Sequence, residues 1–420
     1  MSQADWDRLL HYSRKVKFFE VTCQDSLSIH PSTYFRIAEL RSSALFPSLR
    51  RLSYSLVDLS ISVSIFLFLS PLLESLELFD IEGFEDTIIE PFLATVSSQM
   101  LRRIVLENGN MSVDIFKISI VHFKQLRSLE LLDAVFMDDF VLLEVLGTLP
   151  SLANFTLQAI NPKSHPARAL ENSNSQSGSP KYFEALESLC VTGSFFLIRH
   201  LLGFIDSPCL NSIEVYPVIN PKDVPEDLFT PSLTIVASKW SHSLNNLVIE
   251  SSSNGPAQRY PISKCLVLLT DLHEMQTFRL QYWRMIKNSN DGVRRLVKSW
   301  PKLRTLNLDR TPISLSTLRI IAENCPDLRH LYIRLDSSSI PPLDASSKSL
   351  HHNLEVLTVV KAAPPTITQT ILEYQMQVTQ HLDLIFPYMK SIEVDSKDAI
   401  WLVIRDLVLL CQGASLSRVK

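Results

Sequence analysis

The chain has 420 residues, a formal net charge of -4 and a pI near 6.3, and 46% of its residues are hydrophobic. Proteins that bind nucleic acid usually carry a positively charged surface, which this net charge does not indicate, so we expect no nucleic-acid partner. Only 9 glycines are present, which argues against glycine-rich phosphate loops and doubly wound nucleotide folds. The length exceeds that of one compact core and predicts several domains or a repeat array.

The first 45 residues predict a helical lead-in and a degenerate first repeat. Met1–Arg14 is charged and lacks the apolar stretch of a signal peptide. Leu56–Leu73 is more apolar, but its uninterrupted apolar run, Ile65–Leu69, is too short to span a membrane. We therefore expect a buried repeat helix in this segment and no membrane partner.

One apolar pattern recurs through residues 46–399, which we interpret as the repeat array: an apolar residue, two variable ones, an apolar, one variable, an apolar. The clearest copies are Leu303/Leu306/Leu308 and Leu328/Leu331/Ile333. The same frame fits Leu49/Leu52/Tyr54, Leu73/Leu76/Leu78, Leu101/Ile104/Leu106, Leu126/Leu129/Leu131, Leu152/Phe155/Leu157, Leu186/Leu189/Val191, Leu210/Ile213/Val215, Leu244/Leu247/Ile249, Met275/Phe278/Leu280, Leu354/Leu357/Val359 and Met389/Ile392/Val394, with a degenerate copy at Val16/Phe19/Val21. Their starting positions lie 24 to 35 residues apart, mostly at or above the long end of the leucine-rich class.

The pattern has a physical interpretation. The last two apolar residues of each triplet alternate with a variable residue, so both point inward from a β-strand while the variable residue faces out. Helical patterns lie between the strands, as in Ser314–Asn324 with Ser314 as N-cap, Asp138–Gly147 and Asp291–Trp300. Such units bury an apolar face only by stacking. The sequence therefore predicts an α/β leucine-rich-repeat solenoid, a horseshoe with a concave parallel sheet and convex helices; residues 400–420 form a C-terminal helix and candidate cap.

The variable positions supply a candidate binding surface. Aromatic, arginine and amide side chains on neighbouring strands are typical of surfaces that anchor protein partners. The candidate partner-binding residues are Tyr216, Arg279, Gln281, Asn307, Asp309, Tyr332 and Arg334. An ordinary solvated sheet surface is the alternative interpretation of the same residues.

Longer return segments are expected to gather on one rim, which favours recognition there. They are Gln158–Lys181, Tyr216–Ser232, Glu250–Ile262 and Lys361–Thr366. The alternative is that these segments are loops without a binding role, tolerated because the entropic cost of a loop grows slowly with its length. This alternative applies above all to Asn172–Pro180.

Catalytic signatures such as GxSxG, Walker loops and HExxH do not occur, so we predict no enzyme, no cofactor and no metal site. His351 and His352 are interpreted as the polar start of a repeat. The acidic pairs Glu85–Asp86 and Asp138–Asp139 are interpreted as helix N-termini. Six dispersed cysteines are expected to be reduced, mostly buried thiols of a cytoplasmic or nuclear protein.

Three segments carry a resemblance to a known family. They are Asp5–Lys17 (DWDRLLHYSRKVK), Leu45–Leu52 (LFPSLRRL) and Ser70–Leu78 (SPLLESLEL). As a set they resemble the repeat region of the fungal F-box and leucine-rich-repeat proteins. The resemblance implies a substrate receptor of a cullin-RING ubiquitin ligase, in which F-box helices hold the ligase adaptor and the repeats present a target protein.

In that family the F-box precedes the tryptophan matched here by Trp6, which follows only five residues. We expect adaptor binding only if an F-box lies upstream; otherwise the chain is truncated or has lost that contact. A ligase-independent scaffold or inhibitor is the alternative function, and an enzyme is a third. In each non-enzymatic case we expect a monomer that holds its protein target on the concave face or the loop rim.

Overall fold

The computed structural model describes residues 3–21, 33, 36–37, 44–56, 62–96, 100–109, 123–134, 140–159, 182–218, 225–250, 266–281, 289–336, 340–342, 349–360, 370–394 and 398–418. The chain divides into two compact units, Met1–Leu210 and Asn211–Lys420. We call them the first and the second unit and describe each by itself.

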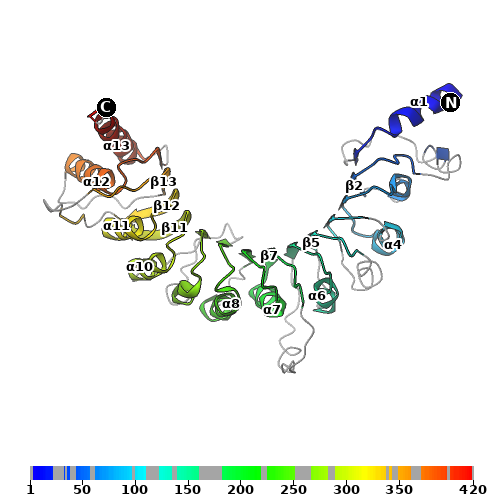
Figure 1. The fold of residues 1–420 in the computed structure, drawn as a ribbon, viewed down its shortest axis with the longest axis horizontal. Helices are drawn as coiled ribbons and strands as arrows, with labels where there is room; N and C mark the ends of the chain where they lie inside the picture. The colour runs from blue at the N-terminus through cyan, green and yellow to red at the C-terminus, as the bar shows by residue number, and fades with distance from the viewer. Residues whose placement is uncertain are drawn as a thin grey trace. The chain divides into compact units, whose positions relative to one another are not determined.

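Parallel strands in chain order form the sheet of the first unit (Figure 1). They are β1 (Phe18–Val21), β2 (Arg51–Ser55), β3 (Ser75–Phe79), β4 (Arg103–Glu107), β5 (Ser128–Ala134), β6 (Asn154–Ala159) and β7 (Ser188–Gly193). Their register aligns the second apolar residue of each triplet, so that Leu52 pairs with Leu76 and Leu76 with Ile104. The triplet pattern therefore predicted both the strands and their alignment.

Helices cover one face of this sheet, as the ribbon shows (Figure 1). The helical elements of the first unit are α1 (Gln3–Ser13), η2 (Val63–Phe68), η3 (Glu85–Ile89), α4 (Glu90–Val96), α6 (Phe140–Gly147) and α7 (Phe195–Phe204). Helix α7 begins after Ser194, whose hydroxyl accepts a hydrogen bond from the Leu197 amide, the usual arrangement of a serine N-cap. Its buried side chains, such as Ile198 and Leu201, point at the sheet.

The second unit repeats the arrangement. Its parallel strands, again in chain order, are β8 (Ser212–Pro217), β9 (Asn246–Glu250), β10 (Thr277–Gln281), β11 (Thr305–Ser314), β12 (His330–Asp336), β13 (Val356–Val359) and β14 (Ser391–Val394). Its helical elements are α8 (Pro225–Trp240), η5 (Val267–Asp271), α10 (Ser289–Ser299), α11 (Leu315–Asn324), α12 (Ile371–Ile385) and α13 (Ala399–Arg418). Helix α13 lies in the segment where the sequence predicts a C-terminal helix, and its role as a cap stays a prediction.

The interior lies between sheet and helices in each unit. The last two apolar residues of every triplet are buried, except in β1, where Phe19 and Val21 are half-buried, and at Val394 of β14. These exceptions belong to the first and last strands, which have a neighbour on one side only. The fold is thus an α/β leucine-rich-repeat solenoid, as the sequence predicted.

Two segments can be compared with expectation. Of the apolar stretch Leu56–Leu73, the structure describes the 3-10 helix η2, in which Ile65 and Phe68 are buried as expected, while residues 57–61 lie outside the described residues. The second half of the expected return segment Tyr216–Ser232 already belongs to helix α8.

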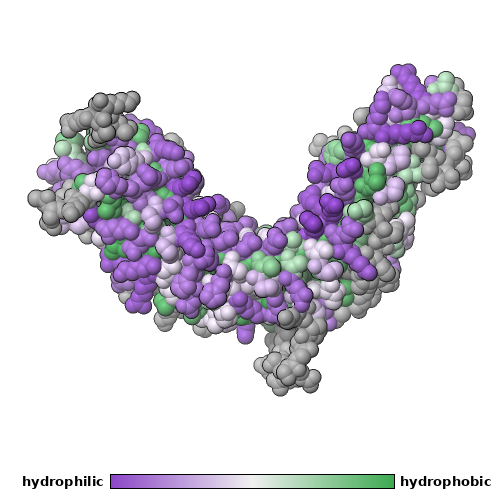
Figure 2. Space-filling view, in the orientation of Figure 1, coloured by the Kyte–Doolittle hydropathy of each residue, from purple (hydrophilic) through white to green (hydrophobic). Residues whose placement is uncertain are grey.

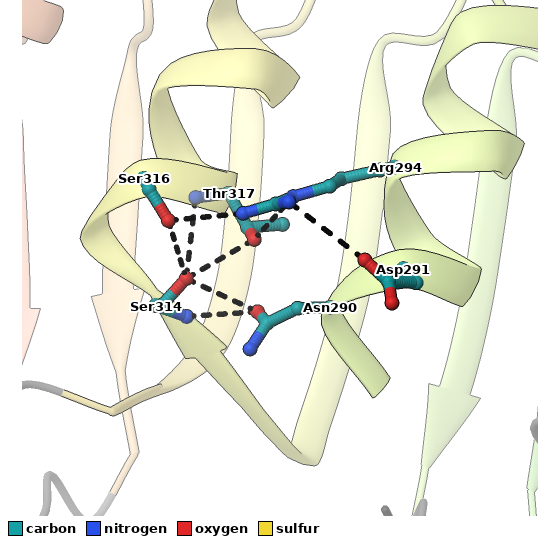
Figure 3. A network of polar contacts seen from close by, with 6 residues as sticks. All are labelled: Asn290, Asp291, Arg294, Ser314, Ser316 and Thr317. Atoms are coloured by element: carbon teal, nitrogen blue, oxygen red, sulfur yellow. Dashed lines mark hydrogen bonds and ion pairs between the residues drawn. The ribbon is translucent and has the colours of Figure 1, made fainter. Parts of the chain in front are cut away.

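Polar contacts tie α10 to the start of α11 (Figure 3). The Ser314 amide donates to the Asn290 Oδ1 at 3.0 Å, and the Ser314 hydroxyl accepts from the Thr317 amide at 3.3 Å. Arg294 of α10 reaches across, its Nη2 donating to the Ser316 Oγ at 3.0 Å and its Nε to the Thr317 Oγ1 at 3.1 Å. Ser314 is therefore the N-cap that the sequence predicted, and it also joins two neighbouring repeats.

Replacing Ser314 with alanine should lower the free energy of unfolding by about 1 kcal/mol, because the α11 N-terminus loses its cap. Urea unfolding followed by circular dichroism measures this loss. Ser299→Ala is the matched control, because the Ser299 hydroxyl only donates to the Arg295 carbonyl of its own helix. An equal loss in both variants would contradict the capping role.

Candidate functional site

A row of outward side chains crosses the sheet of the second unit on the side away from the helices. Each occupies the variable position between the last two apolar residues of its triplet, and strand pairing places each beside the next. In order from β8 to β14 the row is Glu214, Val248, Arg279, Asn307, Tyr332, Thr358 and Glu393. Hydrophilic residues dominate this edge of the second unit in the space-filling view (Figure 2).

A second row lies two residues further along the strands and is interrupted at β11. Glu250 of β9 pairs with Gln281 of β10. The register between β11 and β12 then shifts after Leu308, so that Arg334 pairs with Pro312. Asp309 belongs to this irregular stretch, where it lies 3.7 Å from the Arg310 Nε through its Oδ2.

Three carboxylates of different strands influence one another here. Burial, together with the charges of Asp309 and Glu214, raises the pKa of Glu250 above its ordinary value. Arg279 acts in the opposite direction but does not cancel the effect. Glu214 also accepts a hydrogen bond from the Tyr216 hydroxyl at 3.1 Å through its Oε2. Arg279 therefore offsets only part of the repulsion on Glu250, while Asp309 is paired with Arg310.

Asn307 is unusual for an outward position because its side chain is only 5% exposed. Its Oδ1 is buried and has no hydrogen-bond partner. An amide oxygen in this state typically costs about 1 to 3 kcal/mol of stability. By contrast, Asn246 of β9 donates through its Nδ2 to the Ser212 Oγ at 2.7 Å. Asn307 thus leaves an acceptor unsatisfied between Arg279 and Tyr332.

The structure brings three of the candidate residues, Arg279, Asn307 and Tyr332, side by side on adjacent strands. Gln281 lies on β10 two residues after Arg279. Tyr216 lies on β8, which is separated from β10 by β9. Arg279 is exposed, whereas Tyr332 and Arg334 are half-buried. Their role in binding stays a prediction.

The sequence did not predict Glu250 as part of the outward sheet face, because Glu250 was assigned to the start of a return segment. The signal was present, because Glu250 follows the last apolar residue of its triplet as Tyr216 does. Most of three expected rim segments lies outside the described residues, namely 160–181, 251–262 and 361–366.

The first unit carries a charged cluster on the corresponding face. Arg103 of β4 forms ion pairs with Glu77 of β3 and with Glu130 of β5, the latter at 3.0 Å. These three side chains are partly exposed, so the contribution of each pair to stability is expected to be below about 1 kcal/mol. The cluster therefore links side chains of three neighbouring strands.

Further along the same strands, acidic groups crowd together. Burial and the charges of Asp133 and Asp80 raise the pKa of Glu107. Asp80 and Asp133 have positive φ angles of 54° and 50°, as does Asn108 with 57°, each two residues after the last apolar residue of its triplet. Asp and Asn tolerate this left-handed conformation better than most side chains. The repeat thus places three short polar residues at equivalent turns.

Glu107→Gln should stabilise the first unit by about 0.5 kcal/mol near pH 7, because like charges beside one another destabilise a sheet. The raised pKa means that stability is lost as the pH rises through the folded-state value, so the gain should vanish near pH 3, well below the ordinary pKa, where the carboxyl is protonated in both states. Thermal unfolding at both pH values tests this. Glu187→Gln, at an exposed position, should change neither midpoint.

Among the described residues, no group of three or more His, Cys, Asp or Glu side chains could hold a metal ion. Of the four cysteines within the described ranges, only Cys325 is buried, which corrects the expectation of mostly buried thiols. Cys190 occupies an outward strand position, and Cys209 and Cys411 are exposed. Burial raises the pKa of the Cys325 thiol to about 12, which leaves it unreactive.

His352 also differs from its interpretation as a polar start of a repeat. Its side chain is 4% exposed, and its Nε2 lies 2.8 Å from the Cys325 carbonyl oxygen, to which it donates.

Within the part of the chain that the structure covers, no helix is both long enough and apolar enough to cross a membrane.

Comparison with known proteins shows likeness of fold only. No family model and no curated protein matches the chain. An internalin of Listeria monocytogenes is 15% identical, covers 87% of this chain and 95% of its own length, and has a TM-score of 0.43. Rad7 in complex with Elc1 from yeast is 15% identical, with coverages of 88% and 91% and a TM-score of 0.37. The leucine-rich-repeat protein LegL7 of Legionella pneumophila is 12% identical, with coverages of 76% and 90% and a TM-score of 0.39.

Proposed function

We propose that this protein is a protein-interaction scaffold that holds a partner on the outward sheet face of the second unit. The observation that carries the proposal is the row Arg279, Asn307 and Tyr332, which joins an exposed arginine, a buried amide and an aromatic side chain on adjacent strands. Arginine and tyrosine are among the side chains that contribute most to protein interfaces.

The finer proposal is that the scaffold serves as the substrate-recognition part of an F-box type receptor of a cullin-RING ubiquitin ligase in the cytoplasm or nucleus. It is supported by the three N-terminal segments that resemble the fungal F-box and leucine-rich-repeat proteins. It requires that the natural gene product also contains an adaptor-binding F-box.

Affinity purification of the tagged natural gene product, followed by mass spectrometry, tests both levels. A variant with Arg279→Ala and Tyr332→Ala should lose the partner. A control with Arg295→Ala and Lys298→Ala, two exposed positions of α10, should retain it. Co-purification of adaptor and cullin supports the ligase role. A stable partner without adaptor supports the ligase-independent scaffold, and retention of the partner by the first variant contradicts the proposed face.

A further inference from the structure

Basic side chains line the edge of the first unit at which its strands begin. They occupy one position of the repeat, the residue directly before each of the strands β1 to β5. The amide of each of these residues donates to the carbonyl of the one before it at 2.8 Å, so neighbours in the row lie on neighbouring strands. We call this set the start row: Lys17, Arg50, Glu74, Arg102 and Arg127.

Three of the four basic members of the start row have no neutralising partner. Arg50 forms an ion pair with Glu74, with its Nη1 3.3 Å from the Glu74 Oε1. Lys17, Arg102 and Arg127 are exposed, and they form no ion pair or side-chain hydrogen bond with any residue that the structure describes. Arg102 and Arg127 therefore present two unpaired positive charges at the starts of adjacent strands.

The acidic groups of the same strands do not neutralise this edge. Asp80, Glu107 and Asp133 lie where β3, β4 and β5 end. A strand of five residues spans about 17 Å, which is about twice the distance over which salt screens charges at physiological concentration. The nearer carboxylates are those that already pair with Arg103. The start row is thus a separate basic surface.

Two exposed apolar side chains adjoin the start row. Leu72 is 49% and Met100 52% exposed, and they lie two residues before Glu74 and Arg102, respectively. Because the Arg102 amide is hydrogen bonded to the Glu74 carbonyl, Leu72 and Met100 occupy equivalent places in adjacent repeats. The edge therefore offers positive charge and an apolar contact within one short stretch.

The second unit has basic residues at the same position but lacks this combination. Arg304 and Arg329 directly precede β11 and β12, and the Arg329 amide donates to the Arg304 carbonyl at 2.8 Å. The Arg329 Nη1 lies 3.9 Å from the Glu355 Oε1, and the residues two positions earlier are the charged Lys302 and Asp327. Arg304 and Arg329 therefore provide a matched comparison for Arg102 and Arg127.

The chemistry of the edge favours an acidic protein segment over a nucleic acid. Guanidinium groups pair with both carboxylates and phosphates. Single-stranded nucleic acids, however, also depend on bases stacked on aromatic side chains. Within the described part of residues 44–134, the exposed large apolar side chains are Leu72 and Met100, and neither is aromatic. A segment that alternates acidic and apolar residues matches both features of the edge.

We propose that the start row and its two apolar neighbours bind an acidic segment of a protein. Carboxylates of the segment pair with Arg102 and Arg127, and an apolar side chain of the segment packs against Leu72 and Met100. This surface belongs to the first unit and is independent of the outward sheet face of the second unit, so the failure of one proposal leaves the other standing.

Fluorescence anisotropy of the full chain with labelled peptides tests the charged contacts. The peptide Glu-Glu-Leu-Glu-Glu-Leu-Glu-Glu should bind, and its counterpart with lysine in place of glutamate should not. Arg102→Gln combined with Arg127→Gln should weaken binding about threefold to tenfold, as expected for two ion pairs at a protein surface. The control, Arg304→Gln combined with Arg329→Gln, removes the same charge at exposed, equivalent positions and should leave binding unchanged.

Leu72→Ser combined with Met100→Ser tests the apolar contact. The unaltered protein should bind the leucine peptide more tightly than a peptide with serine in place of leucine, whereas this variant should bind the two alike. The variant retains every charge, so a loss of this preference cannot come from electrostatics. The thermal midpoints of the variants should stay close to that of the unaltered protein, because all four altered residues are exposed.

Three results would overturn the proposal. Equal weakening by the two pairs of arginine substitutions would show that binding follows overall charge. Unchanged binding in the Arg102 and Arg127 variant would place the peptide elsewhere. Tighter binding of a thymidine oligonucleotide or of phosphatidylserine vesicles than of the acidic peptide, lost in the same variant, would make the surface one for nucleic acid or lipid instead of an acidic protein segment.

Discussion

Replacing Trp300 with alanine should lower the free energy of unfolding of the second unit by about 3 to 5 kcal/mol. Trp300 is fully buried, its ring lies 5.0 Å from that of Phe278, and its Nε1 donates to the Leu269 carbonyl at 3.2 Å. The substitution therefore opens a cavity beneath β10 and removes one of the two hydrogen bonds of the Leu269 carbonyl, which still accepts from the Leu272 amide at 3.2 Å. Urea unfolding followed by circular dichroism at 222 nm measures the loss.

Trp300→Phe separates the two contributions. Phenylalanine retains an aromatic ring in the core but cannot donate to Leu269, so a smaller loss of about 1 to 3 kcal/mol is expected. A Trp300→Ala variant that unfolds within about 1 kcal/mol of the unaltered protein would show that the stacked repeats close the cavity by themselves.

Acidification should destabilise the second unit through His352. Burial lowers the pKa of this histidine, whereas its hydrogen bond to the Cys325 carbonyl acts in the opposite direction. The ring donates from Nε2, and Nδ1 is buried without a partner, so protonation would place a positive charge and a new donor in the interior. The unfolded chain has no such penalty and takes up its proton at about pH 6.5.

The sign follows from proton linkage. A histidine whose folded pKa is lowered stabilises the fold above the unfolded value, and this stability is lost as the pH falls from about 6.5 through the folded pKa. His352→Gln should therefore flatten the fall of the thermal midpoint between pH 7.5 and pH 5. The lowered pKa values of His381 and His200 should preserve part of the dependence.

His351→Gln is the control for this prediction, because His351 is the exposed neighbour of His352. It should follow the pH profile of the unaltered protein. The explanation would be wrong if both glutamine variants flattened the profile equally.

The strands were predictable because their signal is local and is repeated. A triplet such as Leu303/Leu306/Leu308 alternates over a few residues, and the same alternation in the next triplet fixes the partner strand and its register. Ser314 was recognisable as a cap for the same reason, since a serine before an apolar helical pattern needs no distant contact to be interpreted.

The environment of Glu250 could not be predicted in the same way. It depends on Glu214 and Asp309, which lie 36 residues before and 59 residues after it in the chain, and on the irregular stretch after Leu308. The burial of His352 depends likewise on a carbonyl 27 residues away. Tertiary packing decides such features, and a pattern of apolar residues does not report it.

Because each strand pairs with its chain neighbours, outward side chains of one row repeat at the distance between hydrogen-bonded strands, about 4.8 Å, whatever the length of chain between them. An extended partner presents like-facing side chains every 6.8 Å or so, and a helical partner completes a turn every 5.4 Å or so. Neither period equals that of the row. The side chains of a regular partner that crosses the strands of the second unit therefore cannot stay aligned with the row over more than a few strands. Close packing is confined to a short stretch, and the remaining strands contact the partner at different points of its repeat.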